Sequence, residues 1–158
     1  GFEKVIINSS AFENYKLIED SAEIFGSQSI VGCIDIKKSI LSNRYLYSHN
    51  GQKKQKINIQ THIKNLINAG IGELIIQSIH LDGTKKGYDL KFLNKISKSI
   101  EIPSIGLGGA GDLSDAVTAI KTTELSAVAA GSIFVYFGTH DAVLINYPER
   151  ALIENLFS

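Results

Sequence analysis

The chain has 158 residues, of which 44% are hydrophobic and 20% charged, with 14 glycines and only 2 prolines, a composition typical of one folded globular domain. Sixteen Lys and Arg residues balance sixteen Asp and Glu residues, so no net charge favours nucleic acid or an anionic membrane as a partner. The single cysteine, Cys33, excludes an intramolecular disulfide, and its place in an apolar run predicts a buried structural thiol.

Targeting features are missing from the sequence. No apolar run is long enough to cross a bilayer and no signal peptide is present, so we expect a cytoplasmic protein. The chain also contains no methionine, from which we expect that Gly1 is not the biological start.

Five short apolar runs, rich in Ile and Val, recur along the chain. They are near-continuous and do not alternate with polar residues, which is typical of parallel strands buried on both faces. The predicted strands lie within residues 4–8, 29–36, 73–79, 102–109 and 126–134.

Helical patterns separate the predicted strands. Asn14 is placed to cap a helix over residues 15–25, which Gly26 would end. A second helix is indicated by apolar residues at helical spacing before Gly70, namely Ile59, Ile63, Leu66 and Ile67.

Two further helices are expected near the glycine-rich segments. Asp89 is placed to cap the first of them, with Leu90, Leu93 and Ile96 facing inward. Ser114 is the expected cap of the next, with Val117 and Ile120 inward.

Residues 39–56 form an insertion between the second strand and its helix. Asn50-Gly51 within it predicts a type I′ hairpin turn. A hairpin at the catalytic end of a strand is either a lid or substrate grip, or a passive decoration.

The strand and helix order predicts an α/β fold of the TIM (β/α)8-barrel type. A closed barrel has eight strands and about 250 residues. The five βα units here therefore predict a single partial barrel domain over residues 1–158, with N-terminal strands missing or supplied by a partner.

Candidate chemistry gathers where the predicted strands end. Asp35 ends a buried strand, with Lys37 two residues on, and is either a general acid or base, or the cap of a turn. The segments 108–111 and 131–132 are either a phosphate nest or tight turns.

Other strand-end residues are less specific. Asp82-Gly83-Thr84 is either an ordinary turn or part of the same functional face. His80 is a possible acid or base, although a surface histidine fits the pattern better. None of the four histidines (His49, His62, His80 and His140) has metal-ligand spacing, so we expect neither zinc nor another cofactor.

Four segments, in this order and spacing, closely resemble the cyclase subunit of imidazole glycerol phosphate synthase. They are GFEKVIINSSAFEN, FGSQSIVGCIDIKK, IIQSIHLDGTKKGYD and GGAGDL. The resemblance covers the family's barrel from its fourth strand to its eighth helix and places strands one to three upstream of Gly1. It implies a lyase of histidine biosynthesis that uses ammonia from a glutaminase partner. The ammonia serves to cleave and cyclise a bis-phosphorylated aminoimidazole ribonucleotide.

The resemblance also implies roles for individual residues. Asp35 matches one of two catalytic aspartates; the other would lie on the missing first strand, so this piece alone is expected to be inactive. Lys4 and Glu73 match a charged gate for ammonia, near a glutaminase interface that would include Glu3 and Gln28. Substrate phosphates would bind Asn8 and Ser9 on one side, and Asp82, Gly83, Gly109, Gly131 and Ser132 on the other.

Three positions depart from the histidine-pathway pattern. His80, Leu81 and Leu107 stand where an acidic residue, an arginine and a serine are usual. The segment 132–149 instead resembles a paralogous branch linked to surface-glycan biosynthesis. In that branch a cyclase-like barrel is expected to supply ammonia for an amidino group on a sugar, so both functions stay open.

Overall fold

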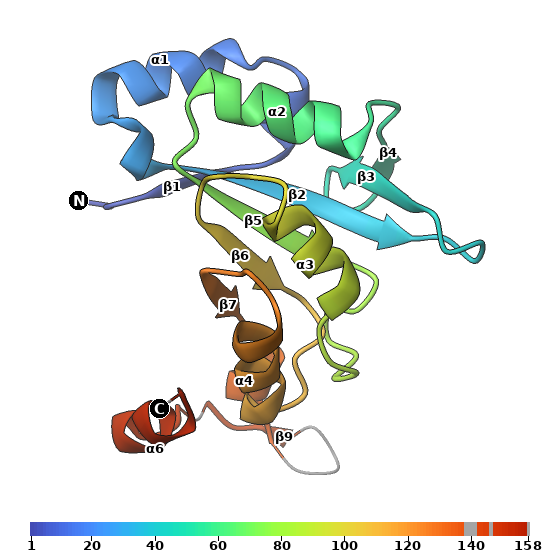
Figure 1. Ribbon diagram of the computed structural model, residues 1–158, viewed down its shortest axis with the longest axis vertical. Helices are drawn as coiled ribbons and strands as arrows, with labels where there is room; N and C mark the ends of the chain where they lie inside the picture. Colours follow the sequence, from blue (N-terminus) through green and yellow to red (C-terminus); the bar gives the residue numbers. More distant parts are fainter. Residues whose placement is uncertain (138–141, 146, 158) are drawn as a thin grey trace.

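The structure, a computed structural model, describes residues 1–137, 142–145 and 147–157. Its main element is a seven-stranded sheet in which five strands run parallel and lie side by side in chain order (Figure 1). They are β1 (Val5–Ile7), β2 (Ile30–Lys38), β5 (Glu73–Ser78), β6 (Ser104–Leu107) and β7 (Ala127–Ala129). All five predicted strands are confirmed. Parallel strands in chain order, joined through helices, form part of a (β/α)-barrel.

Four helices follow the strands along the sheet (Figure 1). They are α1 (Lys16–Phe25), α2 (Ile59–Ala69), α3 (Leu90–Ser97) and α4 (Leu113–Thr122). Each carries its buried residues on one stripe, so that its apolar side covers the sheet.

The core lies between these helices and one face of the sheet. Alternate residues of β2, Ile30, Ile34 and Ile36, pack there with helix residues such as Leu66 and Leu93. The opposite face carries a separate small cluster of Val31, Cys33 and Ile75, with Ile105 and Leu107 packed against it. In a closed barrel this second face is the interior, and we call it the inner face.

The edge of the sheet at β1 is open. Val5 is 53% exposed and Ile6 59%, and neighbouring Phe2 and Phe25 are exposed as well. Beyond its pairing with β2, no described strand pairs with β1, and such an open apolar edge agrees with the predicted partial barrel.

The helix ends confirm some of the predicted caps and correct others. Asp89 accepts a hydrogen bond from Phe92 N–H as predicted, and Gly70 takes the left-handed conformation (φ 107°) that ends α2. The prediction that Ser114 caps α4 was wrong. Asp112 caps this helix by accepting from the N–H groups of Ser114 and Asp115, since an aspartate directly before the first turn reaches both donors.

Two smaller differences concern α1 and α4. The helix α1 begins at Lys16, and Asn14 Oδ1 accepts from Lys16 N–H without occupying the cap position itself. In α4 the buried residues are Ala116 and Ala119, and Ile120 packs against the core as predicted, whereas Val117 is only half-buried.

The predicted hairpin is present. The C-terminal half of β2 pairs antiparallel with β3 (Arg44–Ser48), which pairs with β4 (Lys53–Lys54). Asn50 and Gly51 both have positive φ, and Gln52 N–H donates to His49 O, as a type I′ turn requires. The hairpin therefore extends β2 beyond the rim of the parallel sheet.

The remaining described elements are short. They are the 3-10 helices η1 (Ser9–Phe12) and η2 (Ser27–Ser29), and the C-terminal α5 (Ser132–Val135), β8 (Tyr136–Phe137), β9 (Ala142–Val143) and α6 (Arg150–Phe157). Among the helices described, none combines the length and apolar character needed to span a membrane.

Candidate active site

Asp35 lies on the inner face where β2 leaves the parallel part of the sheet. The residue is only 5% exposed. Its neighbours across the two adjacent strands are Gln77 of β5 and Tyr47 of β3. A carboxyl group is thus held at the C-terminal rim of the strands, where barrel enzymes carry their chemistry.

Asn8, directly after β1, contacts this carboxyl group. Its Nδ2 donates a hydrogen bond of 2.8 Å to Asp35 Oδ1. Burial raises the pKa of Asp35 above its ordinary value, and the hydrogen bond from Asn8 opposes that rise by stabilising the ionised form. A carboxyl group with a raised pKa can hold and release a proton nearer neutral pH, as general acid–base catalysis requires.

Cys33 lies on the same face of the sheet, two residues before Asp35 in β2. Asn8 Nδ2 is also 3.6 Å from its Sγ. Burial, assisted by the negative charge of Asp35, raises the pKa of Cys33 to about 12. The thiol is therefore kept protonated and unreactive, in agreement with the predicted structural role.

Ser9 begins η1 and contacts the tip of the hairpin. Its Oγ accepts a hydrogen bond of 2.8 Å from His49 N–H. The side chain of Asn8 and the hydroxyl of Ser9, both predicted to hold phosphate, thus also connect η1 with Asp35 and with the hairpin.

A row of side chains crosses the inner face at the level of Asp35. The strand register sets Asp35 beside Gln77, Gln77 beside Leu107, and Leu107 beside Ala129. Gln77 Nε2 lies 3.4 Å from Asp82 Oδ2, so it connects β5 with the loop that follows it. Sequence reasoning missed Gln77, although a polar residue at the end of an apolar strand, as at Asp35, was a usable signal.

The glycine-rich loop after β6 packs on the backbone of the loop after β5. Gly87 N–H donates to Gly109 O over 2.8 Å, and Gly109 has φ +106°. A Cβ at Gly109 would lie 2.2 Å from Gly87 O, so only glycine fits. Tyr88, whose hydroxyl donates to Ala129 O, ties the same loop to β7.

Four of the five residues predicted for the second phosphate line one small pocket at the rim. They are Asp82, Gly109, Gly131 and Ser132, which come together with Leu107, Gly108, Ala110 and Ala130. Gly83, the fifth, neighbours the pocket in sequence but does not line it. Leu107 contributes an apolar wall where the resemblance leads one to expect a serine.

Lys4 and Glu73 lie at the opposite ends of the strands and form an ion pair. Because β2 separates β1 from β5, this pair spans the middle strand on the inner face. The pair lies far along the strands from Asp35.

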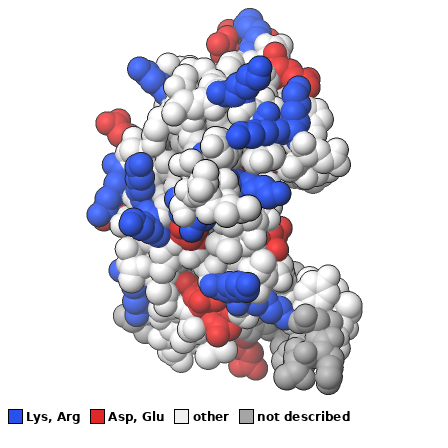
Figure 2. Space-filling model, turned by 90° about the vertical axis from the view of Figure 1, so that its right-hand side faces the viewer, with Lys and Arg blue, Asp and Glu red and all other residues white. Residues whose placement is uncertain are grey.

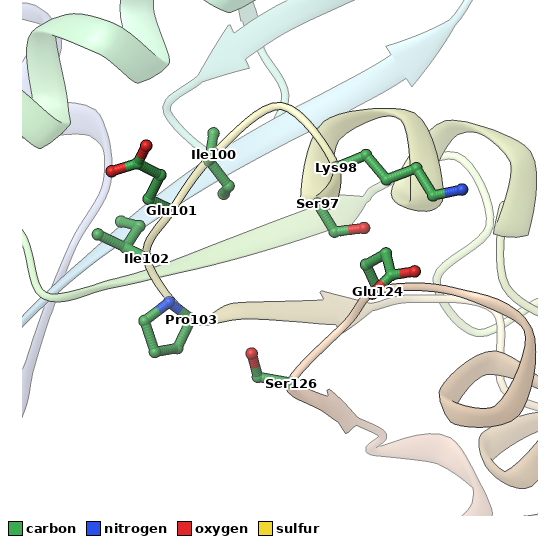
Figure 3. A pocket seen from close by; sticks show the side chains of 8 residues that line it. All are labelled: Ser97, Lys98, Ile100, Glu101, Ile102, Pro103, Glu124 and Ser126. Carbon is green, nitrogen blue, oxygen red and sulfur yellow. The ribbon is translucent and has the colours of Figure 1, made fainter.

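A larger pocket of about 470 Å³ opens at the same end of the sheet, beside the starts of β6 and β7 (Figure 3). In Figure 3 Ser97 and Ser126 extend toward its centre from two sides. None of the predicted site residues lines it. Its lining consists of Ser97, Lys98, Ile100, Glu101, Ile102, Pro103, Glu124 and Ser126.

The histidines differ sharply in their surroundings. His62 is fully buried, accepts or donates a 2.6 Å hydrogen bond with Tyr15 and stacks on Phe12, so it is a core residue. His80 is partly exposed, and within the described residues its buried Nδ1 has no hydrogen-bond partner. His140 lies outside the described residues. The described residues contain no group of three or more His, Cys, Asp or Glu side chains suited to a metal ion.

Arg44 was not singled out from the sequence, yet it connects the hairpin to the loop after β5. Its guanidinium binds Asp89, the cap of α3, through bonds of 2.6 to 3.0 Å from Nε and Nη2. It also lies over Phe92, 4.6 Å from the ring centroid. No sequence signal marks a pair separated by 45 residues.

Comparisons with known proteins identify the family of the chain. Residues 1–141 match the family described as "Histidine biosynthesis protein". A protein of Leptospira interrogans, provisionally named an imidazole glycerol phosphate synthase subunit HisF, is 46% identical over 158 residues, which cover 99% of the chain and 62% of that protein.

Two further relatives carry related names. A Pseudomonas aeruginosa protein, provisionally named subunit hisF2 of the same synthase, is 42% identical over 94% of the chain and 59% of its own length. The imidazole glycerol phosphate synthase subunit HisF of Petrotoga mobilis is 42% identical over 86% of the chain and 54% of its own length. The chain thus spans between 54% and 62% of these relatives.

Proposed function

The chain belongs to the histidine biosynthesis protein family, and we propose that it forms the C-terminal part of the cyclase subunit of an imidazole glycerol phosphate synthase-type glutamine amidotransferase. In this role it is a lyase that uses ammonia from a glutaminase partner. It cleaves and cyclises a phosphoribosyl-formimino aminoimidazole carboxamide ribonucleotide. The single free thiol suits the reducing cytosol in which we place it.

The observation that carries the proposal is the buried carboxyl group of Asp35, held by Asn8 at the rim of the strands. Its raised pKa suits proton transfer to and from the substrate during cleavage and ring closure. In the family the second proton-transferring carboxylate comes from the first strand of the barrel.

The two phosphate groups of the substrate would be held at opposite sides of Asp35. Asn8 and Ser9 flank it on the β1 side, and the pocket of Asp82, Gly109, Gly131 and Ser132 lies on the β6–β7 side. Gly83 contributes backbone next to that pocket. This spacing would orient a bis-phosphorylated ligand with its centre over Asp35 and Gln77.

Ammonia would enter from the other end of the sheet. The Lys4–Glu73 ion pair closes the inner face there, and its side chains are 47% and 22% exposed, so a docked glutaminase can reach them. Disruption of this pair is expected to impair the use of glutamine while leaving the use of ammonium salts intact.

A turnover experiment tests the cyclase role directly. The substrate is supplied with ammonium salts to the whole protein that carries this chain, as wild type and as Asp35→Asn. We expect the substitution to reduce kcat by at least about 100-fold. Asp20→Asn, on the exposed side of α1, is the matched control and should leave kcat unchanged. Unchanged turnover in Asp35→Asn would exclude the proposed role of Asp35.

A second candidate is a divergent barrel that supplies ammonia to a sugar amidotransferase in surface-glycan biosynthesis. It is favoured by Leu107, which adds an apolar wall to the phosphate pocket, and by His80 and Leu81 in the loop after β5. This function predicts that a glutaminase is bound and stimulated while the ribonucleotide is not turned over. The same assay, run with and without glutamine and a glutaminase, separates the two.

A further inference from the structure

Gln77 occupies the last inner-face position of β5. Strand alternation and the register with β2 place it beside Asp35, with Ile75 two residues before it on the same face. On its other side Gln77 pairs with Leu107 of β6. Its side chain is only partly exposed. A polar amide thus stands between a carboxyl group and an apolar side chain at the C-terminal rim of the sheet.

The amide of Gln77 uses only part of its hydrogen-bonding capacity. A glutamine side chain has two N–H donors and one carbonyl oxygen. Nε2 donates to Asp82 Oδ2 over 3.4 Å. Within the described residues Oε1 accepts no hydrogen bond, and it is not enclosed by the protein. An acceptor oxygen therefore remains open to a ligand at the rim.

Asp82 fixes which end of the amide is available. An ionised carboxylate accepts hydrogen bonds and donates none, so it holds the Nε2 end of Gln77 and turns the Oε1 end away from itself. Asp35 has a similar asymmetry, because its Oδ1 accepts from Asn8 whereas its Oδ2 accepts no hydrogen bond within the described residues. Two open acceptor oxygens thus lie on neighbouring strands, whose backbones are about 4.8 Å apart.

The charges around Gln77 disfavour a ligand group that can only accept. Asp35 lies beside it and Asp82 contacts it, so a second carboxylate placed there would face oxygen atoms alone. Figure 2 shows the side of the molecule toward which the strands of Figure 1 point, and on it Lys and Arg side chains are interspersed with Asp and Glu. No single sign of charge covers this side, so individual side chains decide which group binds beside Gln77.

Leu107 supplies an apolar contact next to this acceptor. It packs against the inner-face cluster and also lines the small rim pocket that contains Asp82. Binding sites for small molecules commonly combine an apolar wall with a few polar groups that fix orientation. A flat ring with an N–H-bearing substituent fits this pair, because the ring can lie against Leu107 while the substituent reaches Gln77.

A purely structural role does not account for the open acceptor. In such a role Gln77 would hold the loop after β5 through Asp82, but their contact of 3.4 Å is long for a hydrogen bond. The same loop is already connected to its neighbours by Gly87 N–H and by the hydroxyl of Tyr88. A structural connection of this kind needs only the Nε2 donor.

We propose that Gln77 determines the specificity of the site for a carboxamide: Oε1 accepts a hydrogen bond from the carboxamide N–H of the ligand, and the ring that carries the carboxamide lies against Leu107. The inference rests on the proposed function, whose ribonucleotide has a carboxamide on an aminoimidazole ring. Because this substituent does not react, the loss of Gln77 affects ligand binding and selectivity more than proton transfer at Asp35.

The experiment measures binding by calorimetry to the whole protein that carries this chain. One ligand is aminoimidazole carboxamide ribonucleotide, the fragment of the proposed substrate that retains the aminoimidazole ring after cleavage. The other is its carboxylate counterpart, which has nearly the same shape but only acceptor oxygens. The test variants are Gln77→Met, which removes both hydrogen-bonding groups, and Gln77→Glu, which keeps an acceptor oxygen. Gln60→Met, at an exposed position of α2, is the matched control.

Wild type should bind the carboxamide ligand at least about 100-fold more tightly than the carboxylate ligand. Gln77→Met should lose about tenfold in affinity for the carboxamide ligand, since one hydrogen bond is removed, and less than about twofold for the carboxylate ligand. Gln77→Glu should retain the preference of wild type, because the acceptor is still present. Gln60→Met should leave both affinities unchanged.

Two results would overturn the inference while leaving the proposed function intact. One is wild-type affinity for the carboxamide ligand in Gln77→Met. The other is an equal loss of affinity for both ligands in that variant, which would show a general packing defect. If wild type binds neither ribonucleotide, the proposed substrate is excluded, and the inference about Gln77 is excluded with it.

Discussion

The amide of Asn8 lies 2.8 Å from the carboxylate of Asp35 and is the group that opposes the effect of burial on this acid. A residue expected from the family resemblance to bind phosphate thus also controls the charge of the candidate catalytic residue. The two roles are compatible, because an amide has two N–H donors and one carbonyl oxygen.

Removal of Asn8 should change the pH dependence of activity. Without its hydrogen bond to the ionised form, the pKa of Asp35 rises further. We therefore expect the acid limb of the kcat/KM profile to move to higher pH in Asn8→Ala. Ser10→Ala, in the same 3-10 helix but exposed, should retain the wild-type profile. An acid limb of the kcat/KM profile at the same pH in Asn8→Ala and Ser10→Ala would contradict the role given to Asn8.

Asp35 should also lower the stability of the fold at neutral pH. Because burial raises its pKa in the folded state, the folded chain binds more protons between the unfolded and folded pKa values, and the free energy of unfolding falls as pH rises through that interval. Asp35→Asn removes the buried charge and should stabilise the protein at pH 7 by about 1 kcal/mol. Urea denaturation of wild type and Asp35→Asn at pH 7 and pH 3 measures this stabilisation, which should be smaller at pH 3.

Arg44 should contribute to stability through its contacts with Asp89 and Phe92. Their ion pair is largely buried, with side-chain exposures of 22% and 13%, and its geometry is bidentate. Arg44→Ala should reduce the free energy of unfolding by about 2 kcal/mol. Arg150 pairs with Glu154 at 91% exposure, so Arg150→Ala should change it by less than about 0.5 kcal/mol. Equal changes in the free energy of unfolding in Arg44→Ala and Arg150→Ala would show that the buried ion pair stabilises the fold no more than the exposed one.

His62 should produce a pH-dependent loss of stability. Burial lowers its pKa from 6.5 to about 4, so between these values the unfolded chain takes up a proton that the folded chain does not. The free energy of unfolding should therefore decrease as pH falls from 6.5 to 4, by roughly 3 kcal/mol.

The contribution of His62 can be isolated with two variants. In His62→Gln the pH dependence over this interval should be smaller than in wild type, whereas His49→Gln, at an exposed position, should preserve it. Chemical denaturation at several pH values is the measurement. If the free energy of unfolding depends on pH in the same way in wild type and His62→Gln, the folded protein does not keep a neutral, buried imidazole at position 62.

Alanine should have different effects at two glycines of the pocket proposed to bind phosphate. In Gly109→Ala the new Cβ would lie 2.2 Å from Gly87 O, at a residue with positive φ. We therefore expect the contact between the two loops to be lost and the melting temperature to fall. Gly131→Ala meets no atom within 4 Å, so the melting temperature should stay the same. Its methyl group would instead narrow the pocket and weaken phosphate binding, measurable by calorimetry. Wild-type phosphate affinity in Gly131→Ala would place the phosphate elsewhere.

The sequence by itself was sufficient to predict the five parallel strands, the hairpin and the helix stops. These features depend on local chemistry: apolar runs form buried strands, Asn50-Gly51 adopts positive φ, and Gly70 ends a helix. Asp35 was also identifiable, because a carboxylate that ends an apolar strand has little local reason to be there.

Only the tertiary structure decided which distant side chains meet. Asn8 contacts Asp35 across 27 residues and Arg44 contacts Asp89 across 45. Strand register, which the sequence pattern leaves undetermined between neighbouring strands, places Gln77 beside Asp35 and puts Lys37, Tyr45 and Lys54 on one face. These contacts depend on how separate strands align, and that alignment is a property of the packed sheet as a whole.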